Sequence, residues 1–157
     1  MSGYNSDGAH RRGPEITRIA AYSDGRGSSE LDKAYLEEGH GMRGDKHFGS
    51  PRQLSLLDAD ARDWIDRHAD EGLCLHKFRE NMTVRDLSAL RPVTGMRLQA
   101  GGAELTVTEV CKECYASCPF LADDGDCPLS SGAVFARVDE SGEVRPGDPV
   151  FIISHLL

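Results

Sequence analysis

The feature that most constrains the fold is a series of short apolar segments, separated by turn residues, in the second half of the chain. Gly101-Gly102 joins two of them, and two successive glycines suit a tight hairpin because both can adopt a positive φ. Short strands with frequent turns are typical of a β-barrel or β-sandwich, whereas repeated βαβ units would alternate strands with helices. The predicted strands are residues 81–84, 96–99, 103–110, 134–138 and 149–153.

The first half of the chain adds two predicted strands, residues 16–22 and 53–57, and one helix. Asp58 suits the position before this helix, because its carboxylate can accept a backbone N–H of the first turn. The residues that recur at helical spacing after it are Ala61, Trp64, Ile65 and His68. We therefore expect a mainly β fold, of the barrel type, with a few peripheral α-helices.

The length of 157 residues suits a single domain with one core. Residues 1–14 are polar and rich in glycine and lack apolar periodicity, so burial cannot offset the entropy lost on ordering them. We predict a disordered leader over residues 1–14 and a folded domain over residues 15–157.

The composition argues against two classes of partner. A formal net charge of -8 and a pI near 5.2 disfavour nucleic acid and anionic membranes, because both attract basic surfaces. No run approaches the roughly 20 apolar residues that span a bilayer, and the N-terminus lacks the apolar core of a signal peptide. We expect a cytoplasmic protein without a nucleic-acid or membrane partner.

Positive charge is concentrated in two segments, residues 40–52 and 77–85, although the whole chain is acidic. The first is rich in glycine, which lets backbone N–H groups approach an anion closely. A phosphate or carboxylate would suit both segments, but solvated surface charge explains them equally well. His40, Asp45 and His47 could instead bind a metal. A loop does not bring two histidines at this spacing together as a helix would, which favours ordinary packing and hydrogen bonding.

Four of the five cysteines fall in one short segment, which packing alone does not explain. They are Cys111, Cys114, Cys118 and Cys127, and Cys74 stands apart. Four thiolates could hold zinc or an iron–sulfur cluster, but the spacing does not form two paired ligand knuckles. Alternatively, one thiolate is a nucleophile, sulfur carrier or single metal ligand, activated by the charge of Lys112. We favour the reactive or liganding thiol over the four-cysteine cluster, and both over inert burial.

Several motifs together resemble the MOSC domain, named for the C-terminal domain of molybdenum cofactor sulfurases. They are His40-Gly-Met-Arg-Gly-Asp-Lys-His-Phe-Gly49, Arg52-Gln-Leu-Ser-Leu-Leu57, Glu80-Asn-Met-Thr-Val84, Gly132-Ala-Val-Phe-Ala-Arg-Val138 and Gly142-Glu-Val-Arg-Pro-Gly-Asp148. The resemblance covers roughly Ile16 to Ile153. It implies a β-rich barrel with a few peripheral helices.

The cysteine segment resembles a subgroup of small stand-alone MOSC proteins, which are found with molybdopterin biosynthesis enzymes in anaerobic bacteria. Cys114 occupies the place of the family's characteristic cysteine, which is proposed to carry sulfur or to ligate molybdenum. The resemblance therefore implies that Cys114 is the catalytic thiolate. It also implies candidate metal ligands, which are Cys114, Cys118 and Cys127.

This chain departs from the subgroup at three positions. Cys111 stands in place of a glycine, Tyr115 in place of a histidine, and Arg79 in place of a small residue. The missing histidine is a candidate base, so Lys112 or His47 would have to help form the thiolate.

The resemblance also implies a set of side chains around the cofactor, with cations for the pterin phosphate and polar groups for the pterin. They are His40, Arg43, Asp45, Lys46, Arg52, Gln53, Arg79, Asn81 and Thr83. The expected function is to bind the molybdenum cofactor (molybdopterin) or to deliver sulfur to it. Expected partners are the pterin cofactor or a small sulfur-containing molecule, together with molybdopterin biosynthesis proteins or a cysteine desulfurase.

Two alternative functions are a reductase and a cysteine-cluster module. A bound cofactor could reduce N-hydroxylated compounds, as larger family members do, with an external reductase as the source of electrons. A cysteine cluster that holds zinc or iron–sulfur could instead serve stability or docking. Metal analysis of anaerobically purified protein would separate the two, because molybdenum supports the cofactor and zinc or iron–sulfur supports the cluster.

Overall fold

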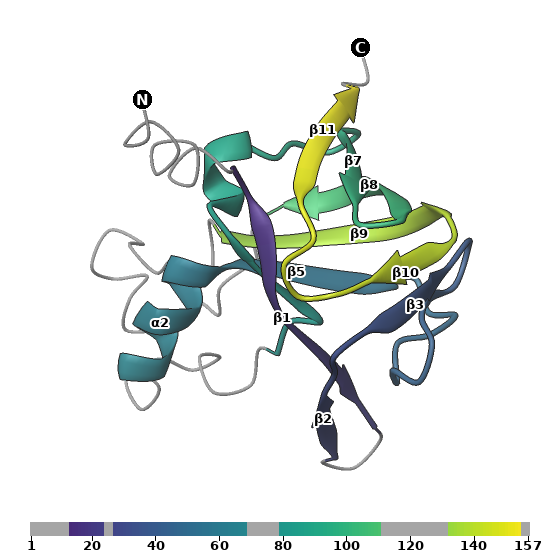
Figure 1. The fold of residues 1–157 in the computed structure, drawn as a ribbon, viewed down its shortest axis with the longest axis horizontal. Coiled ribbons are helices and arrows are strands. Elements are labelled where there is room, and N and C mark those ends of the chain that lie inside the picture. Colours follow the sequence, from purple (N-terminus) through teal and green to yellow (C-terminus); the bar gives the residue numbers. More distant parts are fainter. Residues whose placement is uncertain (1–12, 24–26, 69–78, 111–131, 155–157) are drawn as a thin grey trace, which may run out of the picture.

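The computed structural model describes residues 13–23, 27–68, 79–110 and 132–154, which are mainly β-strands (Figure 1). Eight strands form one sheet in the order β11-β7-β8-β9-β5-β6-β1-β2. Their bounds are β1 Glu15–Tyr22, β2 Ser28–Glu30, β5 Leu54–Asp58, β6 Met82–Arg85, β7 Arg97–Ala100, β8 Ala103–Val110, β9 Ala133–Glu140 and β11 Val150–Ser154. A second sheet, in the order β10-β3-β4, consists of β3 Ala34–Glu37, β4 Gly41–Met42 and β10 Gly142–Val144.

The large sheet curls into a half-barrel (Figure 1). Strands β1 and β11 meet where they begin, since Glu15 and Pro149 form an antiparallel bridge. Beside it, the Val150 N–H donates to the Pro14 carbonyl over 3.0 Å. This contact brings the two sides of the curled sheet together around one core. The prediction of a mainly β, barrel-like fold is confirmed.

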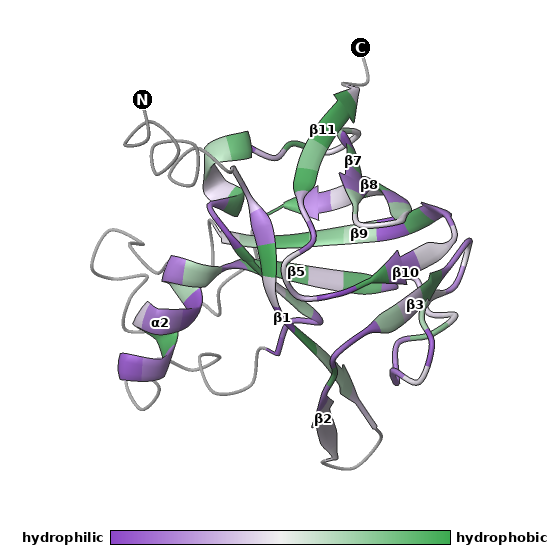
Figure 2. Ribbon diagram, in the orientation of Figure 1, coloured by the Kyte–Doolittle hydropathy of each residue, from purple (hydrophilic) through white to green (hydrophobic). Residues whose placement is uncertain are grey.

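The main core lies inside the curled sheet, and a smaller one lies under the helix. On β5, Leu54 and Leu56 face the main core, whereas Leu57 joins the smaller cluster. Strand β5 is therefore covered on both faces, and its three leucines are divided between the two clusters. In Figure 2, β9 is largely hydrophobic, whereas the helix α2 is largely hydrophilic. The smaller cluster is Leu57, Ala61, Ile65, Ala133 and Phe135.

The predicted helix is confirmed as α2, Ala59–Arg67, and Asp58 caps it. Oδ1 of Asp58 accepts the Asp60 N–H over 2.9 Å, and Oδ2 accepts the Ser88 N–H over 2.7 Å. Ser88 belongs to the 3₁₀-helix η1, Leu87–Leu90. One buried carboxylate therefore ties both helical elements to the end of β5. The helix lies in the connection between β5 and β6, which run parallel and need such a crossover.

The predicted Gly101-Gly102 hairpin is also confirmed, since Ala100 pairs with Ala103 across it and Gly101 has a φ of +54°. The sequence pattern did not reveal four short strands, and one of them lies in the glycine-rich segment of residues 40–52, which was expected to be a loop. The missed strands are β2, β3, β4 and β10. They are too short for an alternating pattern to be visible in the sequence.

Two expectations concern residues outside the described ranges. Of the predicted leader, residues 1–14, only residues 13 and 14 are described, and the cysteine segment lies between residues 110 and 132. Within the described ranges, no helix is long and apolar enough to cross a membrane.

Candidate functional site

Tyr22, the last residue of β1, holds the glycine-rich loop of residues 43–50 in place. Its N–H donates to Oδ1 of Asp45 over 2.8 Å, and its carbonyl accepts the Lys46 N–H over 2.7 Å. Oδ2 of Asp45 accepts the His47 N–H over 3.0 Å. The Asp45 side chain is fully buried. These bonds fix this part of the loop against the end of β1.

His47 extends from this anchor with its ring about half exposed. Its Nδ1 lies 3.3 Å from Oδ2 of Asp45, so the buried carboxylate faces one ring nitrogen and orients the imidazole. An imidazole held by a carboxylate can take or give a proton in acid–base chemistry. His47 is therefore the described residue best placed for proton transfer at this loop.

A second segment, residues 79–83, meets the same tyrosine. The Tyr22 hydroxyl donates to the Glu80 carbonyl over 2.9 Å, and the Arg79 guanidinium carbon lies 6.0 Å from the centre of the Tyr22 ring. The buried Glu80 carboxylate accepts two hydrogen bonds from Arg62 of α2, Nε to Oε2 over 3.1 Å and Nη2 to Oε1 over 2.5 Å. The two positively charged segments of the sequence therefore converge on Tyr22.

Asn81 and Thr83, which the resemblance places around the pterin, are buried and hydrogen-bonded within the fold. The Asn81 side chain accepts the Ser55 N–H over 3.1 Å and donates to the Ala20 carbonyl over 3.2 Å. The Thr83 hydroxyl donates to Oε2 of Glu80 over 2.6 Å. The Asn81 side chain therefore joins the start of β6 to β5 and β1, whereas Thr83 binds the buried Glu80 carboxylate of its own segment.

His40 and Arg43 lie on an exposed face beside the three-stranded sheet, where Glu37 contacts both. Nε of Arg43 is 2.8 Å from Oε1 of Glu37, and Nδ1 of His40 is 3.4 Å from Oε2. Arg43 covers the Tyr35 ring at 4.3 Å, and His40 stacks on Phe48 with 5.1 Å between ring centres. The structure thus places His40 and Arg43 close together, but both face the Glu37 carboxylate of the protein itself.

Arg52 and Gln53 precede β5 and are also engaged within the protein. Arg52 donates to both carboxylate oxygens of Glu109, over 3.1 and 2.9 Å, and its guanidinium carbon lies 4.4 Å from the centre of the Phe135 ring. Oε1 of Gln53 accepts the Val138 N–H over 3.0 Å. Glu109 is the penultimate residue of β8. Arg52 therefore lies beside the point where the chain enters the cysteine segment.

The four candidate cations are of two kinds. Arg43 and Arg52 each bind a carboxylate of the protein. Lys46 and Arg79 have no carboxylate partner within the part of the chain that the structure describes. The backbone N–H of Lys46 and the guanidinium of Arg79 both contact Tyr22. An anionic ligand would meet full positive charge at Lys46 and Arg79, whereas at the other two it would compete with a bound carboxylate.

The residues predicted to carry the sulfur or metal chemistry lie outside the described ranges. They are Lys112, Cys114, Cys118 and Cys127. Their segment leaves β8 after Val110 and reaches β9 through Gly132, and Val110 pairs with Val134 across these strands. Among the described residues, no group of three His, Cys, Asp or Glu side chains could hold a metal. The described loop therefore supplies no metal site at His40, Asp45 and His47.

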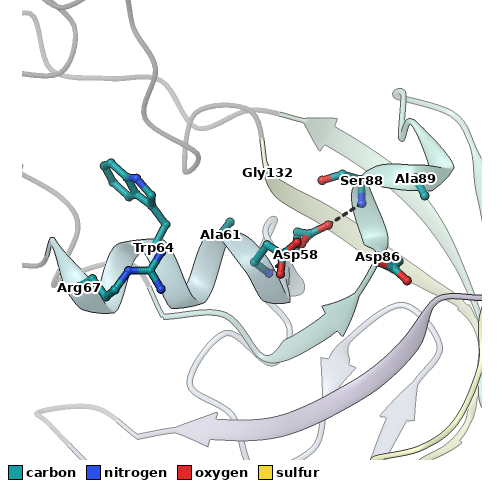
Figure 3. Close-up of a pocket in the computed structure, with 9 residues that line it drawn as sticks. Asp58, Ala61, Trp64, Arg67, Asp86, Ser88, Ala89 and Gly132 are labelled. Carbon is teal, nitrogen blue, oxygen red and sulfur yellow. Dashed lines mark hydrogen bonds between the residues drawn. The ribbon is translucent and has the colours of Figure 1, made fainter. Parts of the chain in front are cut away.

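A cavity of about 470 Å³ lies between α2, η1 and Gly132 (Figure 3). Gly132, which lines the cavity, is the residue at which the described chain resumes after residue 110. Figure 3 shows Trp64 and Arg67 toward one end of the view and Asp58 and Asp86 toward the other. The remaining lining residues are Asp60, Ala61, Ser88 and Ala89. Among the described residues, none of the site residues predicted from the sequence lines this cavity.

Sequence reasoning missed Tyr22 and Arg62, which organise the site. Tyr22 ends a predicted strand, and Arg62 lies among the polar residues of a predicted helix, so each has an ordinary explanation. Their partners Asp45 and Glu80 are 23 and 18 residues away in the chain. No local spacing signals a contact between residues so far apart.

Tyr22 should make the protein less stable at alkaline pH. Burial raises the pKa of the Tyr22 hydroxyl above its ordinary value, the hydrogen bond to Arg18 opposes this, and the charge of Glu80 adds to it. The unfolded chain therefore loses this proton first, so the contribution is complete below about pH 10 and disappears as the pH rises through the folded-state pKa. In urea unfolding above about pH 10, the wild type should lose stability more steeply than Tyr22→Phe. Equal slopes would contradict this assignment.

The family model described as the MOSC domain matches residues 43–151 of the chain. This range includes the loop anchored at Tyr22, the buried Glu80 and the cysteine segment. Among curated proteins, none matches the sequence.

Solved structures of other proteins share the fold. A hypothetical protein superposes with a TM-score of 0.63 and 18% identity, over 94% of this chain and 70% of that one. The YuaD protein from Bacillus subtilis gives 0.62 and 18%, over 87% and 94% of the two chains. YiiM from Geobacillus stearothermophilus gives 0.60 and 16%, over 90% and 75%. At these identities the likeness shows the fold alone.

Proposed function

We propose that this protein, which belongs to the MOSC domain family, binds the molybdenum cofactor or delivers sulfur to it, with Cys114 as the reactive thiolate. MOSC domains are associated in general with this cofactor and with cofactor sulfurases. The observation that carries the proposal is the extent of the family match, because residues 43–151 include both the anchored loop and the cysteine segment.

The described residues fit the anionic part of such a cofactor. Molybdopterin carries a phosphate group, and Lys46 and Arg79 present positive charge that no described carboxylate neutralises. Molybdenum is held by soft ligands, and the thiolates of Cys114, Cys118 and Cys127 are of that chemical type. When bound, the cofactor would supply a metal centre that can change its oxidation state.

Residues of the chain would form and use the thiolate. Lys112 places a positive charge near Cys114 in the sequence, which favours the ionised thiol, and His47 can accept the released proton. The thiolate would attack the outer sulfur of a persulfide donor, such as a cysteine desulfurase. A new S–S bond to Cys114 forms while the S–S bond of the donor breaks, and the donor leaves as a thiolate. Cys114 then carries the transferable sulfur as a persulfide.

The Cys114→Ala variant should therefore lose sulfur uptake completely. Wild-type protein incubated with a low-molecular-weight persulfide should gain the mass of one sulfur atom, and peptide mapping should place it on Cys114. Cys74→Ala removes a cysteine outside the segment and should retain the uptake. Mass spectrometry of the three proteins under anaerobic conditions checks this result.

Metal and pterin analysis of anaerobically purified protein tests the cofactor itself. A protein that retains neither pterin nor molybdenum, and whose Cys114→Ala variant takes up sulfur as well as the wild type does, would contradict the proposal. Bound zinc or an iron–sulfur absorption band would instead support a cysteine-cluster module. Turnover of an N-hydroxylated compound by dithionite-reduced, cofactor-loaded protein would support a reductase.

A further inference from the structure

We infer that a cavity beside the 3₁₀-helix η1 binds a small apolar monocarboxylate, such as a short-chain aliphatic acid, and that Arg91 pairs with its carboxylate group. The cavity has a volume of about 270 Å³. Its walls come from η1, from residues 91–93 and from the chain at the start of β9. Among the described residues, none that the proposed function uses lines this cavity, so binding here does not depend on that function.

Most of the cavity wall is apolar. Leu87 of η1 and Val134 of β9 are almost completely buried, and Pro92 and Val93 extend the wall toward the surface. Val93 is 51% exposed, which makes it the most exposed large hydrophobic side chain among the described residues. An apolar ligand that covers this wall releases the water in contact with it, and this release favours binding.

Arg91 is the one charged residue of the described cavity wall, and Ser88 is the one uncharged polar residue. Within the described ranges, Arg91 has no carboxylate partner, although the chain has a net charge of -8. An arginine can lay its apolar stem along an apolar wall while its guanidinium stays in water, and its planar fork matches the two oxygens of a carboxylate. A phosphate with two charges would lose more hydration than one cation replaces. The charge and the apolar wall together therefore suit a monocarboxylate.

A larger neighbouring cavity, of about 470 Å³, is a poorer site for an anion (Figure 3). The two cavities share Ser88 and Gly132. The described wall of the larger one contains three aspartates and one arginine, so its carboxylates repel an anion. The described wall of the smaller one contains no acidic residue. A carboxylate that approaches η1 should therefore bind on the side of Arg91.

The backbone is strained at both ends of η1. Asp86 has a φ of +61° and Arg91 a φ of +51°, and within the described ranges they are the only non-glycine residues with a positive φ. Such strain persists where surrounding contacts enforce it, and it concentrates at binding sites. Here the Arg91 N–H donates to the Ser88 carbonyl over 3.0 Å, and the buried Asp58 accepts the Ser88 N–H. The wall of the cavity is therefore fixed before a ligand binds.

Titration of hexanoate into the full chain, followed by amide NMR shifts, tests the site. Hexanoate should bind with a dissociation constant in roughly the millimolar range and should shift the amides of η1, Val93 and Val134. Butyrate has two methylenes fewer and should bind about tenfold more weakly, because each buried methylene strengthens binding about fourfold. Hexylammonium has the same apolar body with the opposite charge and should not shift these amides.

Two variants of the unpaired arginines locate the carboxylate. Arg91→Asn removes the charge, and asparagine tolerates the left-handed backbone of this position. It should weaken hexanoate binding about fivefold or more, whereas hexanol, which carries no charge, should bind it as it binds the wild type. Arg67→Gln is the matched control, since it removes the arginine that lines the larger cavity. At about 0.1 M ionic strength this control should change the affinity for hexanoate less than about twofold.

Three results would overturn the inference. They are hexanoate shifts spread over the surface instead of gathered at η1, Val93 and Val134, an Arg91→Asn variant that binds hexanoate as tightly as the wild type, and equal shifts of these amides with hexylammonium. A protein that takes up no sulfur but binds hexanoate at Arg91 would keep this site and lose the proposed function. Sulfur uptake on Cys114 without hexanoate binding would do the reverse.

Discussion

Replacing Arg62 by leucine should lower the free energy of unfolding by about 3–5 kcal/mol. The Glu80 carboxylate is 1% exposed, and Arg62 donates to both of its oxygens. Leucine leaves that carboxylate buried without its guanidinium partner, which costs far more than the loss of a surface ion pair. Trp64 is the only tryptophan and lies on the same helix, so its fluorescence reports urea unfolding directly.

Two further variants test whether the stability loss of Arg62→Leu arises because the ion pair is buried. Arg145 pairs with Glu143 at side-chain exposures of 58% and 44%, and Arg145→Leu should cost less than about 1 kcal/mol. The double variant Arg62→Leu/Glu80→Leu removes both charges and should be more stable than the sum of the two single losses predicts. A cost of Arg62→Leu no larger than that of Arg145→Leu would show that Glu80 finds another partner or reaches water.

Elements built from neighbouring residues could be predicted from the sequence. Asp58 before an amphipathic run is a local signal for a helix start, and Gly101-Gly102 between two apolar segments is a local signal for a hairpin. Both signals depend only on residues a few positions apart. The structure agrees with them because no distant contact opposes the local preference.

The three-stranded sheet could not be predicted, because distant pairing creates it. Strand β10 pairs with β3, with Glu143 opposite Tyr35, although the two lie far apart in the chain. Each strand has only three or four residues, and such short segments carry no visible period. Their partners, not their own sequences, make them strands.

In the candidate site too, local signals could be predicted from the sequence, whereas contacts between distant residues could not. Charge and glycine content located the loop and the segment before β6, but they could not tell which cations stay available to a ligand. Arg52 is 57 residues from Glu109, and only the pairing of β5, β9 and β8 brings them together. The choice of Lys46 and Arg79 over Arg43 and Arg52 is therefore information that the fold adds.

Replacing Gly142 by alanine should lower the free energy of unfolding by about 3 kcal/mol, at the upper end of the usual cost of overpacking. The added Cβ would overlap the Gly102 carbonyl and lie 2.7 Å from the Ala103 nitrogen. These atoms belong to the backbone of the β7–β8 turn, so no side-chain rotation relieves the overlap. The Gly102 N–H also donates to the Glu143 carbonyl over 2.9 Å. Moving β10 away would therefore loosen the link between the two sheets.

Gly147→Ala is the matched control, because it adds the same methyl group where no atom lies within 4 Å. Gly147 has a φ of +99°, so alanine there should cost only the strain of a left-handed backbone, about 1–2 kcal/mol. Gly142 has no such φ, and its cost comes from contact between two sheets. If Gly142→Ala unfolds in urea at the same midpoint as Gly147→Ala or above it, the close approach of β10 to the β7–β8 turn is not what holds the small sheet against the large one.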